Sequence, residues 1–355
     1  MENTGGRQVT VVVVGLALLL AAAVTGVLVL RGSEPTSTPV RAEEPAPGAA
    51  PSVPYWRGGA VDQRGLVWGG DLVAMPRPTA LSWADGVLAV RSDEGVQVLT
   101  GPEEEALRLG PEEGAGLRLA PRGGHAAWLR TVRETSLADG SLRRTVRVVV
   151  QDLDSGERTR SLPLTSRITC CDAGGSATLA GVSDDGAALV SFVGGASLRM
   201  LPDGTLQQLR LRPEATSGLQ HPTWPGGVTW TDGDGALHLA GLTGTGEGTD
   251  ARAVDAGVGL LAFSPDGGRV LRARGGRVEV QPADGGAWSR LDLPAGPAWR
   301  VAALPDEATV LVASDNATGT ARPRAQRCDL DALGCEPVAL PAVRVVLPGG
   351  PTTSW

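Results

Sequence analysis

Short apolar runs separated by Gly, Asp and Pro recur along the chain from Tyr55 onward. The clearest unit begins at Gly257 and reads GVGLLAFS, RVLRAR, RVEVQ and AWSRLDLP, with SPDGG and ADGG between strands. Asp-Gly turns between alternating apolar runs are a strong hairpin signal. The unit therefore predicts four consecutive antiparallel strands.

The same order of parts recurs in five further stretches, with a period of about 40 residues that is typical of a propeller blade. These stretches begin at Ala80, Gly116, Ser176, Pro222 and Ala298. The second of them carries what the sequence presents as an inserted loop, around Arg133 to Arg144. Six complete units are thus expected.

Two leftover fragments complement each other. Gly65–Pro76 resembles the two outer strands of a blade, with Leu66, Trp68, Leu72 and Val73 as its apolar face, and Val343–Pro348 resembles an inner strand. Pairing them would close the ring and remove two sheet edges. We therefore predict an all-β fold, a β-propeller of about seven four-stranded blades over residues 55–355, with six blades as the alternative.

The motif Phe-Ser-Pro-Asp-Gly at Phe263–Gly267, with degenerate copies at Val182–Gly186 and Leu304–Glu307, resembles the repeats of TolB-type and WD-repeat-like bacterial propellers. The resemblance covers residues 60–350, and in that family the motif marks the turn after the innermost strand. It implies the fold alone. The Trp-Asp and Gly-His dipeptides of eukaryotic WD repeats are missing, as is the N-terminal domain of the TolB family, so neither an Asp–His network nor a Tol–Pal role is implied.

An uncharged run, Val9–Leu30, precedes this domain. At 1.5 Å per residue it is long enough to cross the roughly 30 Å hydrocarbon core of a bilayer, and it exceeds the apolar region of a signal peptide. We predict a transmembrane signal anchor at 9–30 behind a short cytoplasmic tail at 1–8, with a cleaved signal peptide as the alternative. Residues 31–54 are rich in proline and predict a disordered linker.

The four cysteines bear on the compartment. Cys328 and Cys335 flank the short acidic turn CDLDALGC, a spacing that closes readily into a hairpin disulfide. An even number of cysteines fits an oxidising environment, whereas free buried thiols are the alternative. The expected location is therefore the cell membrane, single-pass, with the propeller extracytoplasmic.

Charge excludes some partners. The formal net charge is −7 with acidic and basic residues interspersed, and no Lys/Arg cluster is evident in the sequence, so nucleic-acid binding is not expected. The three His have no ligand spacing to a Cys, which disfavours zinc. We expect no cofactor and no metal site.

The turn aspartates are the first candidates for chemistry. They recur at Asp85, Asp185, Asp203, Asp266 and Asp284. Asp before Gly tolerates positive φ and hydrogen-bonds its own turn, so a structural role is favoured over calcium binding. Asp232 and Asp234, in TDGDG, are the only pair for which calcium stays open.

Four residues are candidates for ligand binding. Adjacent Cys170 and Cys171 could form a rigid vicinal turn at a blade-to-blade connection, or pair with the other cysteines. His221 lies in the loop HPTWP, and Trp224 between two prolines is the tryptophan best suited to be a solvent-facing platform. The remaining tryptophans on strands are expected in the core: Trp83, Trp128, Trp230 and Trp299.

Two functions remain. No G-x-S-x-G elbow occurs, and the inner strands supply mainly Gly, Ala, Val, Leu and Ser instead of catalytic side chains. We therefore expect no catalytic residues and favour a non-catalytic module that binds a protein, peptide or cell-wall glycan at the cell surface. The alternative is a propeller hydrolase or lyase acting on a cell-wall or extracellular substrate.

Overall fold

The computed structural model describes residues 50–348, except 59–63, 115, 169–176, 193–195, 211–223, 232–236, 243–244, 255–259, 296–297, 315–323 and 341–344. The predicted tail and anchor, and all but the last residues of the predicted linker, lie outside this part. Within it, no helix combines the length and apolarity needed to cross a membrane.

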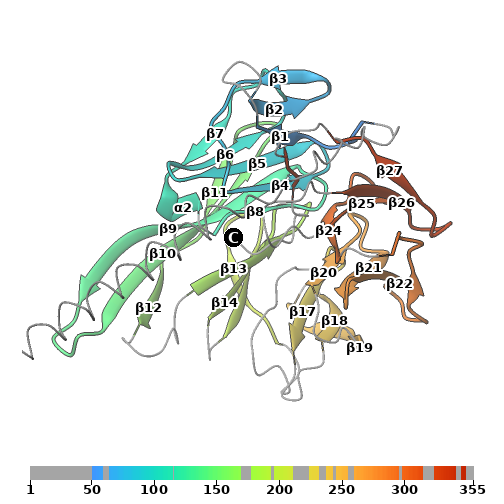
Figure 1. The fold of residues 1–355 in the computed structure, drawn as a ribbon. Coiled ribbons are helices and arrows are strands. Elements are labelled where there is room, and N and C mark those ends of the chain that lie inside the picture. The colour runs from blue at the N-terminus through green and yellow to red at the C-terminus, as the bar shows by residue number, and fades with distance from the viewer. Residues whose placement is uncertain are drawn as a thin grey trace, which may run out of the picture. The chain divides into compact units, whose positions relative to one another are not determined.

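Seven antiparallel sheets form the blades of a β-propeller, as the repeats predict (Figure 1). Blades are numbered here along the chain, and strands are given from the inside outward. Blade 1 contains β28 (Val345–Val346), β1 (Tyr55–Arg57), β2 (Gly65–Trp68) and β3 (Asp71–Val73). Blade 2 contains β4 (Ala80–Ala84), β5 (Val87–Ser92), β6 (Gly95–Leu99) and β7 (Leu107–Leu109), and the short helix α2 (Pro111–Gly114) follows it.

Blade 3 contains β8 (Arg118–Leu119), β9 (His125–Ser136), β10 (Leu142–Asp152) and β11 (Arg158–Arg160), and β12 (Leu164–Ile168) pairs with the far half of β10. Blade 4 contains β13 (Ala177–Val182), β14 (Ala188–Phe192), β15 (Ser197–Met200) and β16 (Leu206–Gln208). In blade 5 the described residues form three strands, β17 (Val228–Thr231), β18 (Leu237–Leu242) and β19 (Gly248–Val254).

Blade 6 contains β20 (Leu260–Phe263), β21 (Arg269–Arg274), β22 (Arg277–Pro282) and β23 (Ser289–Arg290). Blade 7 contains β24 (Trp299–Ala303), β25 (Thr309–Ser314), β26 (Ala325–Asp329) and β27 (Cys335–Val338). Cys328 and Cys335 lie directly opposite each other on β26 and β27 and form the predicted disulfide.

The second strand of a blade is buried on both faces, because a neighbouring sheet covers each side. The first four residues of β5 are all buried, as are the last five of β25. Such strands read as continuous apolar runs instead of alternating ones. The strand tryptophans Trp83, Trp128, Trp230 and Trp299 are at most 7% exposed, which confirms their predicted place in the core.

Blade 1 is shared by the two ends of the domain, as the leftover fragments predict. Trp56 of β1 lies opposite Val346 of β28, and β1 in turn pairs with β2. Strand β1 itself was not expected. Leu66 is fully buried, but Leu72 on the outermost strand is 37% exposed, so its predicted place in the apolar face was wrong.

Residues 133–144 are not an inserted loop. Strands β9 and β10 continue through this segment as one hairpin of 12 and 11 residues, paired from Asp152–His125 out to Leu142–Ser136. Figure 1 shows the hairpin running out beyond the other strands. Because loops and long hairpins can share the same polar residues, the sequence pattern did not separate the two.

The turn aspartates hold their own turns, as predicted for Asp185, Asp203 and Asp266. Asp266 accepts hydrogen bonds from the Ser264 hydroxyl and the Gly268 N–H. Asp306 accepts hydrogen bonds from the backbone N–H groups of Ala308 and Thr309. Burial raises the pKa of the Asp185, Asp266 and Asp306 carboxyls. Hydrogen bonds from within each turn, together with a nearby arginine, outweigh burial and leave each pKa below its ordinary value.

Ring closure predicts a large effect of truncation. Deleting the chain from Val343 onward removes β28 together with Leu347, which is 7% exposed, and opens the pairing edge of β1. At about 25 cal/mol per Å² of apolar area, this loss costs several kcal/mol of unfolding free energy. Thermal melts of the truncated and full chains should differ by many degrees, whereas deleting residues 32–48 should leave the melting temperature unchanged. Equal stability of the C-terminal truncation would contradict a stabilising closure.

The lowered pKa values predict acid sensitivity. A carboxyl whose pKa is lower in the folded state stabilises the fold above about pH 4, and this stabilisation is lost as the pH falls through the folded-state pKa. Asp266→Asn keeps the turn shape but cannot titrate. The variant's melting temperature should therefore fall less than that of the wild type between about pH 5 and pH 2. Identical curves for Asp266→Asn and the wild type would refute this role.

Candidate functional site

The turn between the first and second strands of a blade, here called the inner turn, has one geometry in several blades. In each, a glycine N–H donates to the carbonyl three residues earlier: Gly123 to Ala120, Gly186 to Ser183, Gly227 to Trp224 and Gly267 to Ser264. Trp224–Gly227 has this bond and leads directly into β17, as the other inner turns lead into the second strands of their blades, so we assign it as the inner turn of blade 5. The equivalence places Trp224 on the same face of the propeller as the turn aspartate Asp185.

The inner turns are tied to one another across blades. The Arg122 backbone N–H donates to Asp184 Oδ1 at 2.8 Å, and the Arg122 guanidinium lies 3.2 Å from Glu307 Oε1. Trp224 Nε1 donates to the Gly267 carbonyl at 2.7 Å. These contacts join blade 3 to blades 4 and 7, and blade 5 to blade 6, so this face is cross-linked by polar contacts.

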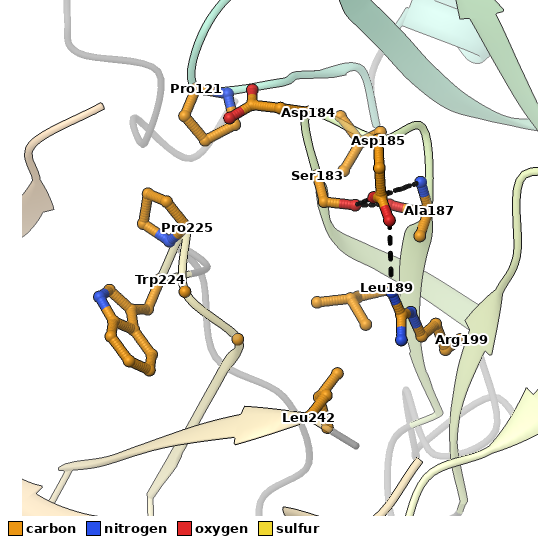
Figure 2. Close-up of a pocket in the computed structure, with 13 residues that line it drawn as sticks. Pro121, Ser183, Asp184, Asp185, Ala187, Leu189, Arg199, Trp224, Pro225 and Leu242 are labelled. Atoms are coloured by element: carbon orange, nitrogen blue, oxygen red, sulfur yellow. Dashed lines mark hydrogen bonds and ion pairs between the residues drawn. The ribbon is translucent and has the colours of Figure 1, made fainter. Parts of the chain in front are cut away.

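A cleft of about 280 Å³ lies between the inner turns of blades 4 and 5. Figure 2 shows Trp224 and Pro225 on one side, with Ser183, Asp185 and Leu189 facing them. Leu242 lies below and Pro121 and Asp184 above (Figure 2). The cleft thus has apolar walls with carboxylates at its rim.

The Trp224 indole is held in place by its neighbours. Its ring lies over Gly226, where an added Cβ would come within 2.6 Å of the ring carbons. Gly267, which accepts the indole N–H bond, has a φ of +73°, a conformation that favours glycine. Glycine at both positions therefore lets the indole approach the backbone closely and line the cleft.

The polar groups on the blade 4 side are largely occupied with one another. Asp185 accepts from the Ser183 hydroxyl and lies 3.6 Å from Arg199 through its other oxygen. The Arg199 side chain is only 18% exposed. Asp184 accepts the Arg122 N–H through Oδ1, and among the described residues its Oδ2 has no partner. Asp184 is therefore the carboxylate left for a ligand.

The other sequence candidates are distributed as follows. Of the predicted ligand-binding residues, Trp224 lies in the cleft, while His221, Cys170 and Cys171 lie outside the described residues, as do Asp232 and Asp234. Cys328 and Cys335 cross-link blade 7, away from the cleft-lining residues. Within the described residues, no group of three His, Cys, Asp or Glu side chains is placed to hold a metal ion.

Sequence reasoning missed Pro121, Asp184, Leu189 and Leu242. Asp184 directly precedes a recognised turn aspartate, so an alignment of inner turns would have placed it beside Trp224. The other three come from different strands and turns of blades 3, 4 and 5. Their proximity depends on how the blades stack, which no local pattern encodes.

A second hollow, of about 480 Å³, lies beside blade 2 and contains Thr79, Arg91, Asp93 and Pro111. It is more open and has no aromatic lining residue. The cleft between blades 4 and 5 is therefore the better candidate for a ligand site.

Comparison with known proteins identifies no family for this chain. No protein-family model and no curated protein matches the chain. Similar solved structures include TolB from Acinetobacter baumannii (12% identity, 82% of this chain, 65% of TolB, TM-score 0.38) and the tricorn protease (13%, 80%, 33%, 0.43). A Mycobacterium tuberculosis puromycin-hydrolyzing peptidase is similar over 60% of this chain and 38% of its own, at 20% identity and a TM-score of 0.36. The chain spans less than two thirds of each of these proteins.

Proposed function

We propose that this chain is a non-catalytic binding module whose propeller captures a short peptide segment of a partner protein in the cleft between blades 4 and 5. The observation that carries the proposal is the placement of Trp224 against Leu189 and Leu242 around a cavity of about 280 Å³. A rigid aromatic side chain next to apolar walls is the usual anchor of a binding hot spot.

A peptide suits this cleft better than a glycan. Sugar rings need many hydrogen-bonding groups, and here Ser183, Asp185 and Arg199 already bond to one another. The walls offer apolar surface from two prolines, a tryptophan and two leucines, which suits one aliphatic or aromatic side chain of a peptide. The carboxylate of Asp184 at the rim adds attraction for a neighbouring Lys or Arg.

We further propose that the module works outside the cell, attached to the membrane through residues 9–30. The length of that apolar run supports a membrane span, and the Cys328–Cys335 disulfide supports an oxidising compartment. The proline-rich residues 31–54 would then act as a spacer between the membrane and the propeller.

The location predicts protease sensitivity. Protease added to intact, wall-stripped cells should degrade the propeller, because the domain lies outside the membrane. A cytoplasmic protein followed in the same cells is the control and should stay intact. A propeller that is fully protected until lysis would show the opposite topology.

The cleft predicts a peptide preference. Random peptides displayed on phage and selected on the full chain in detergent micelles should share one apolar residue beside a Lys or Arg. Leu242→Arg places a cation in the cleft and should reduce binding of the selected peptides at least tenfold, about 1.4 kcal/mol. Asp184→Asn keeps the Arg122 contact. It should weaken binding of peptides that carry the Lys or Arg, and leave binding of the same peptides with that residue replaced by Gln unchanged.

Leu162→Arg is the matched control, because Leu162 is 73% exposed and is not a cleft residue. It should bind the peptides as the wild type does. Equal binding by Leu242→Arg and the wild type would place the peptide site elsewhere. Hydrolysis of a bound peptide would favour the enzyme alternative instead.

A further inference from the structure

The hairpin of blade 3 ends in a small three-stranded sheet. Beyond the blade, β10 pairs with β9 on one side and with β12 on the other, so that Thr145 lies opposite both Arg133 and Thr165. We call this sheet, residues 130–147 with 164–168, the arm. Figure 1 shows β9, β10 and β12 side by side there.

The register sorts the side chains of the arm onto two faces, because residues directly opposite each other in antiparallel strands point the same way. One face takes Glu134, Arg144 and Ser166, which lie opposite one another, and next to them the buried Val146. The bulge at Val132 restores the alternation on β9. The other face is made of Arg130, Arg133, Arg143 and Arg147 with Thr135, Thr145 and Thr165.

This second face, the basic face, concentrates positive charge on an acidic protein. Residues 130–147 hold five arginines and two acids, whereas the whole chain has a net charge of −7. The only acid of the two that lies on a strand, Glu134, pairs with Arg144 on the opposite face at 2.7 Å. The expectation from the sequence that the chain has no Lys/Arg cluster is therefore wrong for the arm.

The charges on the basic face are poorly neutralised. Arg130 lies opposite Arg147, and like charges directly opposite each other destabilise a sheet. Arg130 has Glu113 of α2 at 3.3 Å, but Arg133 and Arg143 are exposed and have no carboxylate partner among the described residues. The Arg147 Nε atom is buried, and no group of the described residues forms a hydrogen bond with it. An anionic ligand would relieve this repulsion.

We propose that the basic face binds a phosphodiester polymer of the poly(glycerol phosphate) type outside the membrane; the choice of a polymer in that compartment rests on the proposed extracytoplasmic location. Guanidinium and hydroxyl groups alternate along β10 at Arg143, Thr145 and Arg147. Both groups are common ligands of phosphate oxygens.

A flexible polyanion fits this face better than a folded protein does. Protein interfaces bury a central apolar or aromatic patch, with charge at the rim. The basic face has arginines and threonines at its centre and no aromatic residue. Binding here is therefore electrostatic and must weaken steeply with salt.

The test uses the full chain in nonionic detergent micelles and a fluorescent poly(glycerol phosphate) oligomer. Arg133→Gln with Arg143→Gln removes two exposed charges from the basic face. Affinity at low salt should fall about 25-fold, since each arginine near an anionic surface contributes about fivefold. The slope of log K against log salt should become shallower by about 1.4, the value for two lost phosphate contacts.

The control is Arg144→Gln with Arg210→Gln, which removes the same charge from positions off the basic face. Arg144 pairs with Glu134 on the other side of the arm, and Arg210 pairs with Glu247 at 3.6 Å in another blade. This control should bind within about twofold of the wild type at each salt concentration. Equal losses in both double variants would reduce the effect to net charge and overturn the site.

Competing polymers test the ligand class. Polyglutamate of equal charge and single-stranded DNA should each bind more weakly than the polyol phosphate. Equal binding of polyglutamate would overturn the phosphate assignment, and tighter binding of DNA would overturn the polyol assignment. Because binding is measured on purified protein, its failure is distinct from failure of the topology experiment or of the peptide selection in the cleft.

Discussion

The pairing of β28 with β1 is the interaction on which the rest of the structure depends. A propeller is a ring of sheets that each need a neighbour on both faces, so an open ring leaves two apolar faces in water. Trp56 and Leu347 join the core cluster that also contains Leu81 of blade 2 and Ala303 of blade 7. Two short strands from opposite ends of the domain thus complete the burial of three blades.

Closure also explains why the inner turns form a usable surface. Once the ring is closed, the inner turns of neighbouring blades lie near one another on one face, where contacts such as Trp224 to Gly267 can span blades. At the cleft, Asp185 holds the blade 4 turn by accepting from the Ser183 hydroxyl and the Ala187 N–H, and the Gly227 N–H donates to the Trp224 carbonyl within the blade 5 turn. The cleft is therefore bordered by short, locally braced turns, and a ligand need not order its walls.

The cleft and the basic face represent two different ways of departing from a regular propeller. In the cleft, a tryptophan stands where the other inner turns begin with a small residue, namely Ala120, Ser183 and Ser264. In the arm, two strands simply continue past the edge of their blade and gather a third.

Much of the fold followed from the sequence, because its signals are local. Asp-Gly turns and apolar strands at a regular period predicted the blades, their number, the shared blade and the Cys328–Cys335 disulfide. Trp224 was predicted as a solvent-facing platform because prolines flank it, and it lines the cleft between blades 4 and 5. Strand β1 was missed because it is only three residues long, and the continuation of β9 and β10 was missed because its polar residues are equally typical of a loop.

Tertiary structure alone decided what surrounds these residues. Leu189 and Leu242 meet Trp224 because blades 4 and 5 pack side by side, at sequence separations that no strand pattern links. The arginines of the arm gather on one face because the strand register and the bulge at Val132 set their direction. The sequence by itself determined which segments become strands and how they turn, since those choices depend on neighbouring residues. Proximity across blades and the sorting of charge onto faces depend on packing and register, and only the folded ring determined them.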